Sequence, residues 1–188
     1  RQYESVRSLL PTARMPAQST HAENLGAISD HFDVFLLDAF GVLNVGETGI
    51  YGAIKRVELL KNIGKKVLVL TNGARLPAEN ALKKFLELGF YFDLSEIVSS
   101  RDALAAGLLP LPGDGFWGVM SSQNSQIETL GVPCHRLEDD KSTYDKASGF
   151  ILLSSSEWNN ARQLLLRESL AQAPRPILVG NPDIIAPR

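Results

Sequence analysis

The sequence predicts an α/β fold built on a parallel sheet, followed by a second α/β unit. Two runs of four apolar residues, at 34–37 and 67–70, have the length and composition of buried strands. Apolar residues recur at helical spacing between them, over 53–63. A strand, a helix and a strand in this order form a βαβ unit, whose strands are parallel and whose crossover is right-handed. A stretch rich in proline and glycine, 110–115, then separates this pattern from a second one.

The composition describes a chain that can bury a core and has little net charge. Of the 188 residues, 44% are hydrophobic, and 19 Lys and Arg balance 21 Asp and Glu. This balance gives no reason to expect nucleic acid or an anionic membrane as a partner. The apolar runs are far shorter than the roughly 20 residues that span a bilayer, and the first thirty residues do not resemble a secretory signal. We expect a cytoplasmic protein.

Strands and helices are predicted to alternate along the whole chain. The first half predicts a short helix at 22–28, strands at 34–37, 67–70 and 96–100, and helices at 53–63, 76–88 and 101–109. The second half predicts strands at 115–120, 150–153 and 176–179, and helices at 125–130 and 157–171. Because the strand at 34–37 is apolar throughout, we expect both of its faces to be buried. Segments 44–52 and 138–141 are predicted as loops, the second one charged and solvated.

Polar residues follow the first two strands where each of them ends. Asp38 closes the first strand, and Thr71, Asn72 and Gly73 close the second. Parallel neighbours end at the same edge of a sheet and lie about 4.8 Å apart, so the two groups can converge on one small ligand. A hydroxyl and backbone amides at a strand-to-helix junction suit an anion, most often phosphate. Taken singly, each group would be an ordinary turn or cap.

Cys134 is the single cysteine of the sequence, so no disulfide forms within the chain. It follows a proline in a turn-like stretch, and a lone thiol is usually structural. His135 lies next to it, but adjacent residues of a strand point to opposite faces. We therefore predict no Cys–His catalytic pair, and the lone cysteine fits a reducing compartment.

The order of these motifs resembles the haloacid dehalogenase (HAD) superfamily. An apolar strand followed by Asp-Ala-Phe-Gly-Val-Leu at 38–43 resembles its first motif, and the strand that ends in Thr71 and Asn72 resembles its second. Only 32 residues separate the two motifs, whereas about 80 lie between Ser100 and Gly-Asn-Pro-Asp at 180–183. A cap after the second motif resembles class IIA, the branch of nitrophenyl-, pyridoxal- and phosphoglycolate phosphatases and NagD-type nucleotide phosphatases.

The resemblance implies a HAD-like, Rossmann-type parallel-sheet core, present as its first half, with an inserted α/β cap. The implied divisions are an N-terminal segment at 1–30, the core at 31–109, the cap at 110–179, and a return toward the core at 180–188.

It also implies phosphoryl transfer to Asp38, which would serve both as the nucleophile and as a Mg²⁺ ligand. The main-chain carbonyl of Phe40 would be a second metal ligand, and Thr71, Asn72 and Gly73 would hold the phosphoryl oxygens. We expect a small phosphorylated metabolite as the substrate, with Arg75 and Asp183 facing it.

Phe40 departs from the phosphatase pattern, which has a second Asp two residues after the nucleophile. That Asp protonates the leaving oxygen, and losing such a group costs roughly 10²–10⁴-fold in rate. The sequence therefore keeps two alternatives open, a slow or non-catalytic relative that binds a phosphorylated ligand or a protein, and a metal-independent dehalogenase-like hydrolase. Dehalogenases proper also have an aromatic here, but their cap lies between the two motifs, where this sequence has no room. An uncharacterised group within class IIA carries an aromatic as well.

The end of the sequence, Arg188, comes before the lysine and the final acidic motif that the family places after the Asn-Pro-Asp stretch. By analogy we expect a truncated form of a protein about 100 residues longer. A core sheet that lacks strands leaves an unpaired edge and exposed apolar surface. We therefore expect the chain to associate with other molecules, including copies of itself as a homo-oligomer.

Overall fold

The computed structural model describes residues 2–5, 7–9, 12, 14, 16–108 and 114–182. The helices are α1 (Gln2–Ser5), α2 (Ala53–Asn62), α3 (Ala78–Glu87), α4 (Ser100–Gly107), α5 (Lys141–Lys146) and α6 (Asn160–Gln172), with 3₁₀ turns η1 (Arg7–Leu9), η2 (Leu25–His31), η3 (Leu94–Glu96) and η4 (Ile127–Leu130). The strands are β1 (Val34–Asp38), β2 (Asn44–Val45), β3 (Thr48–Gly49), β4 (Lys66–Thr71), β5 (Ile97–Ser99), β6 (Trp117–Met120), β7 (Cys134–Arg136), β8 (Gly149–Leu152) and β9 (Ile177–Val179).

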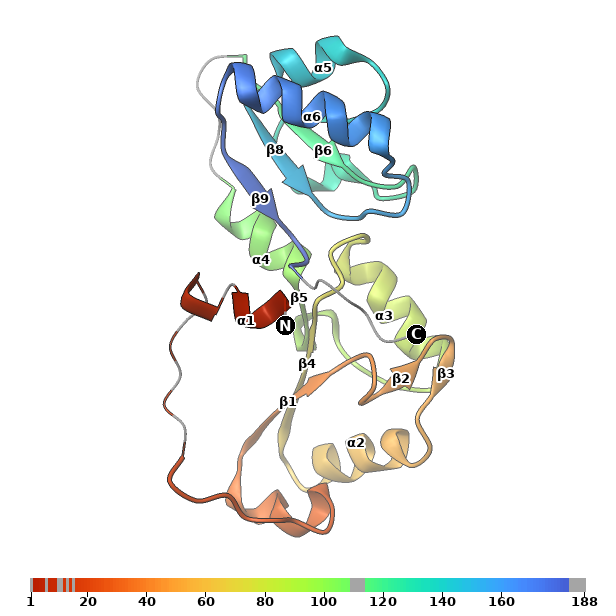
Figure 1. Cartoon of the computed structure of the whole chain (residues 1–188). Coiled ribbons are helices and arrows are strands. Elements are labelled where there is room, and N and C mark those ends of the chain that lie inside the picture. The colour runs from red at the N-terminus through yellow and green to blue at the C-terminus, as the bar shows by residue number, and fades with distance from the viewer. Residues whose placement is uncertain are drawn as a thin grey trace.

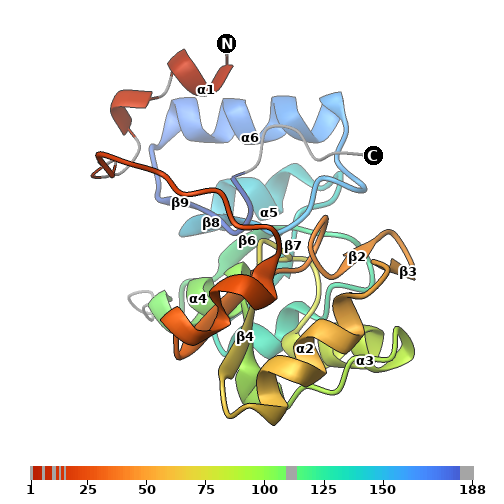
Figure 2. The ribbon, with the colours of Figure 1, turned by 90° about the horizontal axis from the view of Figure 1, so that it is seen from below.

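The described chain forms two lobes stacked end to end, with α4 between them (Figures 1 and 2). The first lobe holds a parallel sheet in the order β1-β4-β5, and the second holds a parallel sheet in the order β7-β6-β8-β9. This arrangement confirms the predicted α/β fold and its parallel core strands. The predicted boundary at 110 falls in 109–113, outside the described residues.

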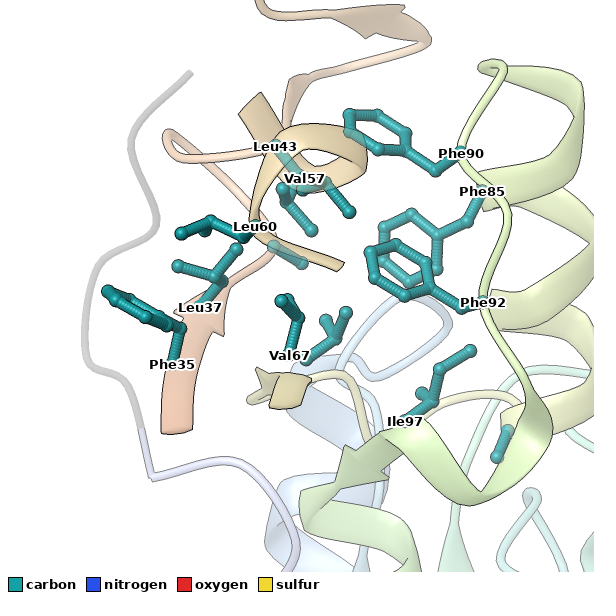
Figure 3. Packing of buried hydrophobic residues seen from close by; sticks show 13 residues of the cluster. Phe35, Leu37, Leu43, Val57, Leu60, Val67, Phe85, Phe90, Phe92 and Ile97 are labelled. Atoms are coloured by element: carbon teal, nitrogen blue, oxygen red, sulfur yellow. The ribbon is translucent and has the colours of Figure 1, made fainter. Parts of the chain in front are cut away.

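The first lobe has its core on one face of its sheet. Alternate residues of β1 and β4 pack there against α2, α3 and the segment that follows α3. Three aromatic rings, those of Phe85, Phe90 and Phe92, form the far wall of this core (Figure 3), with ring centroids 5.6–6.2 Å apart. Edge-to-face and stacked rings of this kind stabilise a core beyond the area that they bury.

The opposite face of the first sheet is exposed, so the prediction that β1 is buried on both faces was wrong. Val34 and Leu36 are 47% and 57% exposed, and their neighbours Leu70 and Val98 are each 40% exposed. The reason is that the helices α2 and α3 both pack against the other face of this sheet. An apolar run predicts a strand from its own composition, but burial of each face depends on a partner element.

The second sheet is covered on both faces. One face packs against α5 and α6 through Tyr144, Phe150 and Leu166. The other face packs against η4 and against α4, the helix that leaves the first lobe, and Ala74 of the first lobe is buried in this cluster. The two lobes therefore share apolar packing next to the end of β4.

Several local predictions differ from the structure. Segment 44–52 contains the short antiparallel pair β2 and β3, and β7 was not predicted. The charged stretch 138–141 leads directly into α5, where the Asp140 carboxylate accepts a hydrogen bond from the Ser142 amide at 3.1 Å and so caps the helix. The predicted helices at 22–28 and 125–130 are the 3₁₀ turns η2 and η4. None of the described helices is long and apolar enough to span a bilayer.

Candidate active site

Asp38 and Thr71 are the last residues of the neighbouring strands β1 and β4. Asp38 lies opposite Leu70 in the register, and Thr71 lies opposite Ser99 of β5. The two residues are thus one step out of register, and strand alternation directs their side chains to opposite faces of the sheet. A ligand that touches both side chains has to lie beyond the strand ends, at the edge that faces the second lobe.

The Asp38 carboxylate is exposed at this edge, and its Oδ1 accepts a hydrogen bond from the Ala39 amide at 2.7 Å. The chain then turns sharply, because the Ala39 carbonyl accepts bonds from the amides of Leu43 and Asn44 at 2.9 and 3.1 Å. Gly41 makes this turn possible with φ of 84°, a value that L residues rarely adopt. The turn places Phe40 at the edge of a pocket that Thr71 also lines.

The segment after β4 is also folded on itself. The Thr71 Oγ1 accepts a hydrogen bond from the Gly73 amide at 3.1 Å, a turn typical of Ser and Thr. The hydroxyl hydrogen is left to bond an acceptor, such as a phosphoryl oxygen. Thr71 can therefore shape the turn and donate to an anion at the same time.

A pocket of about 250 Å³ lies next to this turn, between the loop after β1 and α3. Four of the predicted site residues line it, namely Phe40, Thr71, Gly73 and Arg75. The remaining lining residues are Ala39, Asn44, Leu76, Pro77, Asn80, Ala81, Lys84, Phe85 and Ser99. Asp38 and Asn72 are not among the lining residues, and the predicted Asp183 lies outside the described residues.

Arg75 connects the two lobes. Its Nη1 donates to the Asn124 Oδ1 of the second lobe at 3.3 Å. Asn124 belongs to the polar loop 121–126 that follows β6, in which Ser121, Ser122 and Ser125 are buried. The Oδ1 of Asn124 also accepts from the Ser122 hydroxyl at 2.9 Å. A polar loop of the second lobe therefore lies against Arg75, although the residues that line the pocket all belong to the first lobe.

The oxygen ligands available for a metal are few. No group of three or more His, Cys, Asp or Glu side chains among the described residues is placed to hold a metal ion. At the strand ends the described chain supplies one carboxylate, Asp38, and the main-chain carbonyl of Phe40. Mg²⁺ prefers oxygen ligands, keeps several waters and is often held by one or two carboxylates with substrate phosphate. The residues fit a minimal Mg²⁺ site of this kind.

Cys134 lies partly buried in β7, and desolvation raises its pKa to about 11. A thiol with so high a pKa is a poor nucleophile at neutral pH. The ring of His135 packs against Phe116, with 4.3 Å between the ring centroids. That neither residue is catalytic stays a prediction.

Sequence reasoning missed the residues that hold the loops of the site. Arg101 is almost fully buried between the lobes, and the serines of the loop after β6 were not singled out. The one feature of the sequence that could have indicated a role for Arg101 is its position, two residues after the end of a strand. Its burial depends on the second lobe, which no local pattern around Arg101 reveals.

The chain belongs to the haloacid dehalogenase-like hydrolase family, whose sequence pattern matches residues 35–131. Within this family it is similar to the class IIA branch of NagD and the 4-nitrophenylphosphatases. The 4-nitrophenylphosphatase of Schizosaccharomyces pombe is 35% identical over 108 residues, which are 55% of this chain and 36% of that protein.

Solved structures show the same fold. A 4-nitrophenylphosphatase of Thermotoga maritima matches 86% of this chain and 59% of its own with a TM-score of 0.68 at 20% identity. A glycerol phosphate phosphatase of Mycobacterium tuberculosis in complex with magnesium matches 86% of this chain and 48% of its own with a TM-score of 0.64 at 18% identity. The chain thus spans well under two thirds of the length of these relatives.

Proposed function

We propose that the protein is a phosphatase-type HAD hydrolase that acts on a small phosphate ester, with Asp38 as the acceptor of the phosphoryl group. The observation that carries the proposal is the position of Asp38 and Thr71 at the ends of neighbouring parallel strands. Relatives named for nitrophenyl phosphate and glycerol phosphate support a small ester as the substrate. The pocket of about 250 Å³ beside Thr71 suits a compact ligand.

In the proposed reaction, an Asp38 carboxylate oxygen attacks phosphorus, the ester O–P bond breaks, and the leaving oxygen takes a proton from solvent, because Phe40 offers none. Water then attacks the aspartyl phosphate and releases inorganic phosphate with a free carboxylate. The Thr71 hydroxyl and the amides that follow it would bond the phosphoryl oxygens, and Arg75 would face the organic part. Phosphoryl transfer depends mostly on positioning and charge compensation, which these groups supply.

Mg²⁺ is the expected cofactor, and Asp38 and the carbonyl of Phe40 are its proposed ligands. When bound, the ion would neutralise the negative charge shared by the carboxylate and the phosphoryl group. The proposal is supported by the magnesium complex of the Mycobacterium tuberculosis relative.

A second candidate function is favoured by Phe40, which lines the pocket and is 41% exposed. A phenyl ring cannot protonate a leaving oxygen or activate water. The protein would then bind a phosphorylated ligand with little or no turnover. A slow, metal-independent hydrolase of the dehalogenase type would also use Asp38 as the nucleophile.

The test measures hydrolysis of 4-nitrophenyl phosphate with and without Mg²⁺, for the wild type and for Asp38→Asn. The matched control is Asp33→Asn. Asp33 lies immediately before β1, at the end of the strand opposite to Asp38, and its side chain is 99% exposed. We expect Mg²⁺-dependent turnover that Asp38→Asn abolishes and Asp33→Asn leaves within about twofold. Turnover that persists in Asp38→Asn would contradict the proposed nucleophile, and phosphate binding without any turnover would favour the second candidate.

A further inference from the structure

Arg101 is a buried cation at the junction of three segments. It lies in the first turn of α4, its exposed fraction is 2%, and its guanidinium contacts both lobes. Nη1 donates to the carbonyls of Ala74 and Arg75 at 3.3 and 3.2 Å. Nη2 donates to the carbonyl of Gln126 at 2.8 Å and to the hydroxyl of Thr129 at 3.0 Å. One side chain therefore joins the segment after β4 to the start of η4.

The charge of Arg101 is compensated by neutral oxygens. Among the described residues, no carboxylate forms an ion pair with it. The adjacent Asp102 carboxylate is engaged by the amide and hydroxyl of Ser99 at 3.0 and 2.7 Å. Burial lowers the pKa of Arg101, yet a guanidinium remains charged in proteins. Its planar fork matches several fixed acceptors at once, which the single ammonium of a lysine does not.

The contact with Gln126 holds a backbone conformation that is uncommon for this residue type. Gln126 has φ of 47° and ψ of 53°, and it is the one non-glycine residue with positive φ in the described part of the chain. Its carbonyl accepts from Arg101, from the Thr129 hydroxyl at 2.9 Å and from the Thr129 amide at 3.1 Å. Such a conformation persists where the surroundings fix it, and it is frequent at functional sites.

Arg101 joins the segment beside the candidate pocket to a segment of the second lobe. Ala74 and Arg75 directly follow the Thr71 turn, and Arg75 bonds Asn124 in the loop before Gln126. Arg101 is the second residue of α4, the helix that runs between the lobes (Figure 1). Without this link, the exposed contact between Arg75 and Asn124 and the apolar packing around Ala74 would have to hold the two segments together.

We propose that Arg101 is a positioning residue that fixes the second-lobe segment 121–129 against the strand-end segment 71–75, so that the second lobe is held in one place beside the candidate site. The proposal rests on the proposed function for the chemistry of that site. It does not require Arg101 to touch the substrate.

The first test measures the distance between the lobes by double electron–electron resonance. Spin labels are placed through Tyr51→Cys in the first lobe and Arg167→Cys on α6, both exposed positions, in a Cys134→Ser background. We expect one narrow distance distribution for the parent protein, a distribution at least about twofold broader for Arg101→Met, and an intermediate one for Arg101→Lys. The same narrow distribution in folded Arg101→Met would overturn the proposal.

Arg175→Met is the matched control. The Arg175 guanidinium also donates to backbone carbonyls, those of Tyr144 and Ala147 at 2.8 and 2.7 Å, but all of its partners lie within the second lobe. We expect this variant to lose stability without broadening the distance between the lobes. If Arg101→Met does not fold, Thr129→Val removes one acceptor of the same fork, and an unbroadened distribution there would contradict the proposal.

The second test compares kinetic constants for 4-nitrophenyl phosphate. Loss of the hydrogen bonds that hold Arg75 and the second-lobe segment together is expected to raise KM about fivefold in Arg101→Met. The rise is expected to be less than about twofold in Arg175→Met. Equal KM values in the two variants would argue against the positioning role. A protein that neither hydrolyses nor binds the ester would contradict the proposed function, and the distances between the lobes would still decide the role of Arg101.

Discussion

Phe40 is the residue whose chemistry differs most from a working phosphatase site. It follows Asp38 by two residues and lines the pocket beside Thr71. A carboxyl group at this position could protonate the leaving oxygen and later activate water. In the proposed reaction, Phe40 therefore leaves the leaving oxygen without this proton donor.

Phe40→Asp is predicted to increase the turnover of 4-nitrophenyl phosphate by about 10²-fold, within the range expected for general acid–base catalysis. The measurement is kcat at saturating substrate with Mg²⁺ present. Phe40→Asn, which has a similar size but no titratable proton, is the control and is expected to give no such gain. A rate unchanged in Phe40→Asp would show that proton transfer does not limit the reaction.

Cys134 is predicted to react slowly with iodoacetamide in the native protein. Desolvation raises its pKa to about 11, so about one thiol in a thousand is ionised at pH 8, against about one in four for a free cysteine. Alkylation followed by mass spectrometry should be more than tenfold slower than in urea-unfolded protein. Equal rates in the two states would contradict the buried environment.

The candidate site residues could be identified from the sequence only where strand ends carry unusual side chains. Asp38 and Thr71 are of this kind, because each closes an apolar run. Arg101 and Gln126 were missed, since their roles depend on a contact between lobes far apart in the sequence. The opposite directions of the Asp38 and Thr71 side chains also follow from the strand register, which periodicity does not give.

At the scale of elements, long periodic segments were predicted well and short ones were not. The strands around 34–37 and 67–70 and the helix between them are present, because an apolar run and a helical period specify them locally. The pair β2 and β3 has two residues in each strand, too few for any period to be visible. The charged stretch before α5 was predicted as a loop, although its Asp140 is the cap of a helix.

Asp140→Ala is predicted to lower the melting temperature at pH 7 through the loss of this cap. Hydrogen bonds from Ser142 and Thr143 lower the pKa of Asp140 in the folded protein. The stabilisation is therefore fully present above the pKa of an unfolded Asp, about 3.9, and is lost as the pH falls through the lower folded value. The difference in melting temperature from the wild type should shrink between pH 5 and pH 3. The control is Asp114→Ala, at an exposed aspartate in a turn outside the helices. A difference that stays constant over this range, or that equals the effect of Asp114→Ala, would contradict the assignment.

At the scale of the whole molecule, the exposed face of the first sheet is the most unusual feature. Val34, Leu36, Leu70 and Val98 present apolar side chains there, and β1 is an edge strand of its sheet. Exposed apolar patches and open sheet edges favour association. By contrast, both faces of the second sheet carry packed elements.

We expect the protein to form oligomers as its concentration rises, and Leu36→Lys to shift the equilibrium toward the monomer. A charge on this face opposes its burial against another apolar surface. Light scattering coupled to size-exclusion chromatography measures the mass at several concentrations. Leu164→Lys, at a similarly exposed leucine on α6, is the control and should leave the mass unchanged. A monodisperse wild-type monomer at all concentrations would contradict the prediction.

The central claim is that Asp38 accepts the phosphoryl group, and binding of beryllofluoride in the presence of Mg²⁺ tests it without requiring turnover. This anion mimics a phosphoryl group bonded to a carboxylate, and ¹⁹F NMR detects its bound form. We predict a bound resonance for the wild type and for Asp33→Asn, and none for Asp38→Asn. A bound resonance that survives Asp38→Asn, or its absence from the wild type, would contradict the assignment of Asp38 as the acceptor.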